Sequence, residues 1–259
     1  MNSRSVYPLR VLGRRARRWL RQVSWRVPRL AVPSRDGWQP AGGPVLVIAP
    51  HPDDEVIGCG GTILRHTAAG DPVTVVYLTR GEEGHGYPWL SPEERGRVRE
   101  AEARRSCRIL GVSQVVFLDC GDQRVESSGC DTQLAEIIAS SRPSAIFVPH
   151  ARDNHADHAA AHRLLLRALA STPQPFGCCL WGYETWSPLH VDAAVDITRF
   201  MRQKVRALAC HQCALDISDW IPAVKGLGAY RSVTCFDRRG YAEAFERVPW
   251  QDRFSEVDT

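Results

Sequence analysis

The 259-residue chain is long enough to bury the core of one α/β domain or of two small domains. Its 44% hydrophobic and 24% charged residues are ordinary for a soluble globular protein, and the absence of any run of about 18 apolar residues excludes a membrane span. The formal charge of +4 is unevenly distributed. Residues 1–40 contain ten arginines and one aspartate, a balance of +9, which leaves −5 for the rest of the chain. This argues against a basic nucleic-acid-binding face on the main body.

The basic N-terminal segment is expected to form an amphipathic helix. Residues 10–27 place apolar side chains at helical spacing, with arginines on the other faces. The segment lacks the apolar stretch and small-residue cleavage site of a secretory signal. It could contact an anionic membrane surface as a peripheral helix, or pack on the protein's own body. Because residues 31–43 are rich in proline and glycine, we predict an arm and linker over 1–40 and one domain over 41–259.

The chain contains nine cysteines, an odd number, and five of them lie in segments that look like core: Cys59, Cys107, Cys120, Cys178 and Cys179. This usage favours reduced, buried thiols in a cytoplasmic protein over a disulfide framework. The CxxC spacing at 210–213 could be half of a zinc ribbon. A second CxxC is missing from the sequence, so helix packing is the favoured interpretation.

Strand and helix patterns alternate along residues 45–170, and the pattern beyond residue 176 is less regular. The predicted strands are 45–48, 73–79, 115–118, 145–149, 178–181 and 193–197. The predicted helices are 62–69 after a tight glycine turn at 58–61, 93–110 between a Ser91 cap and Gly111, 133–140, 159–170 and 198–209. This alternation predicts right-handed βαβ units, and therefore an α/β domain with a mostly parallel sheet flanked by helices. The GxGxxG spacing of a nucleotide-binding module is absent.

The first predicted strand ends in a dense polar cluster, His51-Pro52-Asp53-Asp54-Glu55. Three carboxylates and an imidazole are costly to bury unless a cation or solvent offsets them. Open α/β sheets bind their ligands at the carboxyl ends of their strands. The cluster is therefore expected to form half of a metal site. Glu82, after the second strand, is expected either at the rim of this site or in a plain acidic loop.

A second cluster follows the fourth predicted strand and includes Asp153, His155, Asp157 and His158. His155 and His158 would lie one turn apart on one face of the following helix. Asn154 is the expected N-cap, with Asp157 in a capping-box-like position. Solvated residues at a helix start could explain a lone histidine, but they explain so dense a cluster poorly.

Together the clusters predict hydrolysis of an amide or ester. Two histidines and an aspartate with an open fourth position are typical of a catalytic Zn²⁺ site. Zinc lowers the pKa of a bound water toward about 7. A neighbouring carboxylate can move a proton to the leaving group, and a further histidine can stabilise an oxyanion.

Residues 50–55 and 155–158 resemble the two signature motifs of the LmbE/PIG-L family of zinc-dependent N-acetylglucosaminyl deacetylases. Supporting matches run through residues 45–246 and include Thr79–Glu82, Arg99, Lys204 and His211. The family usually has alanine where Pro50 stands and proline where Ala156 stands. Both departures concern loop geometry more than chemistry.

The resemblance implies a Rossmann-like fold and specific residue roles. His51, Asp54 and His158 would bind one Zn²⁺ per chain, although the site could also take Fe²⁺. Asp53 would be the general base and acid, His155 would polarise the intermediate, and Asp157 would orient His155 or tune its pKa. We also expect substrate contacts from Arg99, Glu82 and Asp153.

The predicted function is removal of the N-acetyl group from an N-acetylglucosamine-type sugar of a glycoconjugate or a secondary-metabolite intermediate of the aminoglycoside or glycopeptide type. A small N-acetylated amino sugar is the expected partner, with no nucleic acid; the sequence leaves the oligomeric state open. One alternative is a zinc amidase that releases a different acyl group. Another is a non-catalytic glycan-binding module, in which Asp53→Asn would leave function intact.

Overall fold

The computed structural model describes residues 42–172, 178–237 and 239–250, so the predicted arm over 1–40 and its helix at 10–27 lie outside the described residues. The described chain forms one seven-stranded sheet in the order β3-β2-β1-β4-β5-β7-β6. The strands are β1 (Val45–Ala49), β2 (Val73–Tyr77), β3 (Gln114–Phe117), β4 (Ala145–Pro149), β5 (Cys179–Tyr183), β6 (Ala193–Asp196) and β7 (Ala242–Arg247). β1 to β5 are parallel, and β7 is antiparallel to β5 and β6. The predicted fold class is confirmed.

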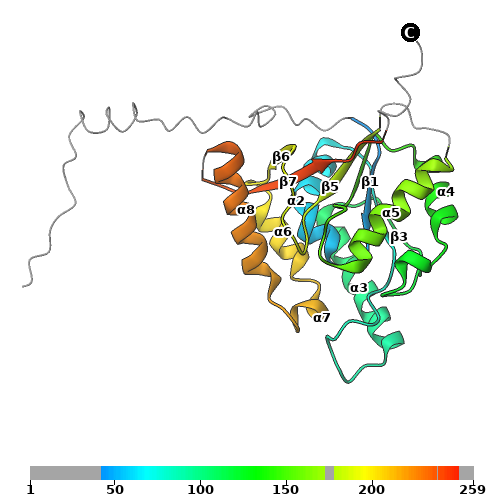
Figure 1. The fold of residues 1–259 in the computed structure, drawn as a ribbon. Coiled ribbons are helices and arrows are strands. Elements are labelled where there is room, and N and C mark those ends of the chain that lie inside the picture. The colour runs from blue at the N-terminus through cyan, green and yellow to red at the C-terminus, as the bar shows by residue number, and fades with distance from the viewer. Residues whose placement is uncertain (1–41, 173–177, 238, 251–259) are drawn as a thin grey trace, which may run out of the picture. The chain divides into compact units, whose positions relative to one another are not determined.

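Helices cover both faces of the sheet, and each face has its own apolar core (Figure 1). One core joins Val45 and Val47 of β1 to α2 (Asp54–Ala69), α3 (Pro92–Leu110), α6 (Met201–Leu208) and α8 (Trp220–Phe236). The other joins Leu46 and Ile48 to α4 (Asp131–Ser141) and α5 (Ala156–Ala170). Successive β1 residues thus point to opposite faces, which explains why this strand is apolar throughout. The short elements η1 (Val125–Ser127) and α7 (Gln212–Leu215) lie in loops.

The strand order reverses between β1 and β4, which are parallel neighbours. Chain connections leave these two strands in opposite directions along the sheet, which opens a crevice at their carboxyl ends. The two polar clusters of the sequence follow these two strands. Residues about a hundred positions apart are thereby brought side by side.

Helix α2 begins earlier than predicted. It starts at Asp54, but its backbone is not helical at Cys59, where φ is −138° and ψ is 20°, so two helical segments meet at a kink within the predicted turn at 58–61. After the kink, the Gly61 and Thr62 amides both donate to the Glu243 carboxylate of β7 at 2.7 Å. Lys204 pairs with Glu243 at 2.6 Å and also donates to the Ile57 carbonyl. Glu243 of β7 and Lys204 of α6 therefore form hydrogen bonds with backbone groups on either side of the kink.

Gly58 permits the close approach of α2 to β5, and this gives a stability prediction. A Cβ at Gly58 would overlap the ring of the buried Tyr183. We expect Gly58→Ala to lower the free energy of unfolding by about 1–3 kcal/mol, because overpacking forces side chains out of place. No atom of the described residues lies within 4 Å of a Cβ added at Gly226 of α8, so Gly226→Ala should be neutral or stabilise by about 0.4–1 kcal/mol. Urea unfolding of both variants measures the difference; equal effects would contradict the packing argument.

The remaining element boundaries agree with the sequence in most places. Helix α3 has the predicted Ser91 cap, with a capping box to Glu94, and ends at Gly111 with φ 77°. Helix α8 is absent from the sequence prediction. Its buried positions are Val224, Gly228, Arg231, Ser232 and Cys235, so the inward face lacks an apolar stripe. Within the described residues, no helix is both long enough and apolar enough to cross a membrane.

The cysteine prediction is wrong for one pair. Cys120 and Cys130 form a disulfide bond. Cys59 and Cys107 are free and buried as expected, but Cys178 is only partly buried and Cys179 is exposed. The disulfide closes the loop between β3 and α4, and the sequence spacing alone gave no reason to pair these two residues.

Candidate metal centre

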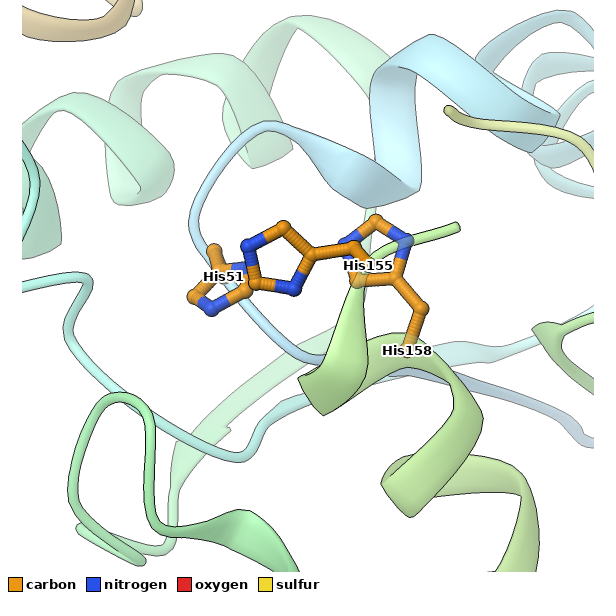
Figure 2. A group of neighbouring side chains, drawn as sticks. All are labelled: His51, His155 and His158. Carbon is orange, nitrogen blue, oxygen red and sulfur yellow. The ribbon is translucent and has the colours of Figure 1, made fainter. Parts of the chain in front are cut away.

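The candidate metal centre lies at the carboxyl ends of β1 and β4. His51 follows β1, whereas His155 and His158 stand at the start of α5, and the three rings gather around one volume (Figure 2). Ring centroids are 5.5 Å apart for His51 and His158, 4.8 Å for His51 and His155, and 4.7 Å for His155 and His158. Nitrogen atoms of all three lie within 4.8 Å of one another, which is close enough to hold a metal ion.

Asp54 lies between two of these histidines. Its Oδ2 is 3.2 Å from His51 Nδ1 and 3.2 Å from His158 Nε2. A tetrahedral zinc site with bonds of about 2.0 Å separates its ligand atoms by about 3.3 Å. The same Oδ2 accepts the His51 amide at 2.9 Å, which fixes the carboxylate. The structure therefore places the Asp54 carboxylate beside a nitrogen of both His51 and His158, the residues predicted with it as ligands.

His158 provides the clearest test of whether a metal ion fits. Both ring nitrogens are buried and lack a hydrogen bond of acceptable geometry among the described residues. Carboxylate oxygens of Asp54 and Asp153 nevertheless lie 3.2 Å from Nε2 and Nδ1. A buried polar atom without a partner is costly. A cation beside Nε2 would satisfy that nitrogen and neutralise the Asp54 carboxylate, so the residues present fit a divalent metal ion.

The electrostatics favour a cation as well. Burial lowers the pKa of His51, but carboxylates of Asp122, Asp157 and Asp54 raise it more, and the net pKa is well above the usual range. Burial likewise opposes protonation of His158, yet Asp54 and Asp153 raise its pKa to about 9. An excess of buried carboxylates thus surrounds the imidazoles, and a divalent ion would compensate that charge.

Asp53 has a strained backbone and a perturbed carboxyl group. Its φ of 129° is in a region that side chains other than glycine rarely adopt. The Asp53 amide donates to the fully buried Glu55 at 3.1 Å, and Arg99 approaches its carboxylate at 3.5 Å. Burial raises the pKa of Asp53 to about 6, although the Arg99 charge opposes this. Such strain and perturbation are typical of residues held for function.

His155, not Asn154, is the N-cap of α5. Its Nδ1 accepts the Asp157 amide at 3.3 Å, while its own amide donates to Asp153 Oδ1 at 3.0 Å. The predicted capping role of Asn154 is wrong, because the side chains of Asp153 and His155 accept the backbone amides at the helix start. A neutral His155 ring that accepts at Nδ1 carries its proton on Nε2, which leaves one N–H donor for a ligand.

Asp122 is a site residue that the sequence analysis missed. It lies in the loop after β3, and its Oδ1 is 3.2 Å from His51 Nε2. The Asp157 carboxylate lies at the same distance from this nitrogen and accepts the Gln123 amide at 2.8 Å. His51, Asp122 and Asp157 form a second group that could hold a metal ion. Asp122 follows a glycine in a loop and belongs to no motif, so the sequence gave no signal that would have identified it as a site residue.

A cavity of about 260 Å³ opens beside the metal centre. Arg99 lines it, whereas the other two predicted substrate contacts, Glu82 and Asp153, are not among its lining residues. Glu82 accepts the Asp122 amide at 2.9 Å, and Asp153 lies behind His158. The cavity lining comprises His51, Asp53, Asp54, Ile57, Glu83, Gly84, His85, Arg99, Asp122, Gln123, His155, Trp186, Ala214, Ile217, Ser218 and Trp220.

Comparison with known proteins decides the family. The profile of PIG-L, described as GlcNAc-PI de-N-acetylase, matches residues 46–169, which include both polar clusters. The chain is 31% identical over 226 residues to diacetylchitobiose deacetylase of Thermococcus kodakarensis, covering 79% of this chain and 83% of that protein. The chain belongs to the PIG-L family. Members of this family are enzymes, so the predicted class of hydrolase is confirmed.

Other relatives differ in what they act on. The chain is 34% identical over 160 residues to 1D-myo-inositol 2-acetamido-2-deoxy-alpha-D-glucopyranoside deacetylase of Thermobifida fusca, but it spans only 56% of that PIG-L relative, with 51% of this chain aligned. The structure of N,N'-diacetylchitobiose deacetylase from Pyrococcus horikoshii has a TM-score of 0.71 and 26% identity, covering 83% of this chain and 88% of that one. GalB, a 4-carboxy-2-hydroxymuconate hydratase of Pseudomonas putida, has a TM-score of 0.70 at 23% identity, with 80% of this chain and 96% of that one covered. The latter likeness shows the fold alone.

Proposed function

We propose that this chain is a metal-dependent N-deacetylase that releases acetate from an N-acetylglucosamine-type sugar. The observation that carries the proposal is the convergence of His51, Asp54 and His158, with 3.2 Å between Asp54 Oδ2 and a nitrogen of each histidine. The deacetylase relatives support the choice of an amide substrate. The variety of their substrates leaves the group attached to the sugar to be determined by experiment.

His51, Asp54 and His158 are the proposed ligands of the ion, with zinc as the expected metal. Zinc bound there would act as a Lewis acid on the amide carbonyl and lower the pKa of a water molecule. Asp153 and Asp157 approach the outer nitrogens of His158 and His51, at 3.2 Å each. We assign both aspartates the role of orienting a ligand ring, in place of the substrate contact predicted for Asp153 and the role toward His155 predicted for Asp157.

Asp53 is the proposed general base and acid. It lines the cavity, and burial raises its pKa to about 6, which makes it a better proton acceptor than an ordinary aspartate while it remains largely ionised at pH 7. It would take a proton from the attacking water and return it to the leaving amine. His155 would donate its Nε2–H to the oxyanion that develops on the amide carbonyl.

The test is product analysis with a panel of N-acetylglucosaminides. We expect acetate and free amine in equal amounts, loss of activity after chelation, and recovery when Zn²⁺ is added back. Full activity after rigorous chelation would contradict the proposal. Turnover of another amide with no acetate from any N-acetyl sugar would favour the zinc amidase alternative, and binding without turnover would favour a glycan-binding module.

A further inference from the structure

A second cavity lies beside the metal-site cavity. Its volume is about 160 Å³, and residues of α2, α6, α8 and β7 line it together with the loop after β5. The two cavities share Ile57, Trp186 and Trp220. The indole rings of Trp186 and Trp220 meet edge to face at 5.2 Å, and Trp186 is 53% exposed. The aromatic pair therefore forms a common wall, and one ligand could extend past it from the metal centre.

The charged residues of this second cavity have their charges balanced within the protein. Lys204 and Glu243 pair at 2.6 Å and satisfy the bend in α2. Glu184 forms a buried ion pair with Arg231 and also accepts the Leu189 amide. These groups offer no free charge to a ligand. The rest of the lining is mostly apolar, with side chains such as Val224, Leu227 and Pro188.

Among the described residues, one hydroxyl of the cavity lining has no hydrogen-bond partner. Thr185 is 8% exposed, and its Oγ1 is buried without a hydrogen bond in the part of the chain that the structure describes. A buried hydroxyl left unpaired is costly, which favours a ligand that brings one polar atom to it. The cavity is thus suited to an apolar group with a single polar contact. An apolar cavity of about 150 Å³ can hold a benzene-sized molecule.

We propose that the second cavity binds an apolar substituent of the substrate, an aryl or short alkyl group attached to the amino sugar whose amide lies at the metal centre. This inference rests on the proposed function and deepens it. The aglycone and an acyl chain longer than acetyl both attach next to the reacting group. The aglycone agrees with release of acetate, whereas a longer acyl chain would favour the zinc amidase alternative. Burial of one apolar group of this size should improve kcat/KM about tenfold to a hundredfold.

The experiment compares three compounds by release of free amine: N-acetylglucosamine, its phenyl β-glycoside and N-hexanoylglucosamine. A preference for the phenyl glycoside identifies the aglycone as the occupant, and a preference for the hexanoyl compound identifies the acyl chain. Equal kcat/KM values for all three would overturn the proposal.

A cavity-filling variant tests the location. Ala223 is exposed and lines the second cavity but not the metal-site cavity, so Ala223→Phe should remove the preference and leave turnover of N-acetylglucosamine within about twofold. Val233→Phe places the same ring at an exposed position of α8 outside both cavities, and the preference should remain. A preference that survives in Ala223→Phe would overturn the proposal.

A binding measurement separates this proposal from the proposed function. Phenyl β-glucoside has no amide, and its binding can be followed by tryptophan fluorescence. If no compound is hydrolysed, the deacetylase proposal fails. Binding of phenyl glucoside to the unaltered protein and to Val233→Phe, but not to Ala223→Phe, would still support the cavity assignment. Equal affinity for the three proteins, or binding to none of them, would overturn it.

Discussion

Asp53→Asn is expected to lower kcat by about 10²–10⁴, the usual contribution of a positioned general base. Asparagine has nearly the same shape and can still occupy the unusual backbone conformation at φ 129°, but it cannot accept a proton from water. The measurement is steady-state amine release by the metal-loaded protein. Retention of full activity would remove Asp53 from the mechanism and favour the glycan-binding alternative.

A matched control separates the loss of a base from damage to the fold. Asp119 also has positive φ, at 55°, but its carboxylate is exposed and pairs with Arg80. Asp119→Asn should keep activity within about twofold, because exposed ion pairs contribute little. Both variants should bind as much metal as the unaltered protein. A loss of metal in Asp53→Asn would mean that Asp53 is needed to hold the metal ligands in place, and the loss of activity could then not be assigned to a missing base.

His158→Ala is expected to abolish metal binding and, with it, turnover. Removal of a residue that hydrogen-bonds to a metal ligand costs about 10–100-fold in metal affinity or activity, and loss of the ligand itself should cost more. Metal content is measured by elemental analysis after dialysis. The control is His162→Gln, one turn further along α5, where the ring lies near the Pro149 carbonyl and outside the metal centre. This variant should keep its metal.

His51, Asp122 and Asp157 form the second group that could hold a metal ion, and metal binding by this group would contradict the proposed ligand set. If Asp122→Asn and Asp157→Asn remove the ion while Asp54→Asn and His158→Ala retain it, the metal is held by His51, Asp122 and Asp157. The opposite pattern is expected. Because Asp122 and Asp157 approach the nitrogen of His51 that faces away from Asp54, their replacement should weaken metal binding and not abolish it.

The parts of this fold that follow from local pattern were predictable from the sequence. Strand β4 and helix α3 agree with their predicted bounds to within one residue, since an apolar run and a complete set of caps mark them. The two polar clusters were recognisable because carboxylates and imidazoles at strand ends are costly without a ligand. Their convergence followed from the expectation that parallel strands end at one edge of the sheet.

The parts that depend on long-range contacts were not predictable. The kink of α2 at Cys59 is accompanied by a contact with Glu243, about 180 residues away, which accepts the Gly61 and Thr62 amides. Helix α8 was not predicted because Gly228 and Arg231 lie on its buried face and interrupt the apolar periodicity by which a helix is recognised. Asp122 joins the site only because its loop folds back over His51. In each case the stabilising partner lies outside the sequence window in which periodicity is read.

The central claim is that one divalent ion is bound by two histidines and an aspartate at the junction of β1 and β4. Anomalous diffraction from crystals of the zinc-loaded protein, recorded on both sides of the zinc edge, tests this most directly. The account predicts a single strong peak about 2.0–2.2 Å from a nitrogen of His51, a nitrogen of His158 and an oxygen of Asp54. A peak bonded to other residues, or no peak in this crevice, would contradict it.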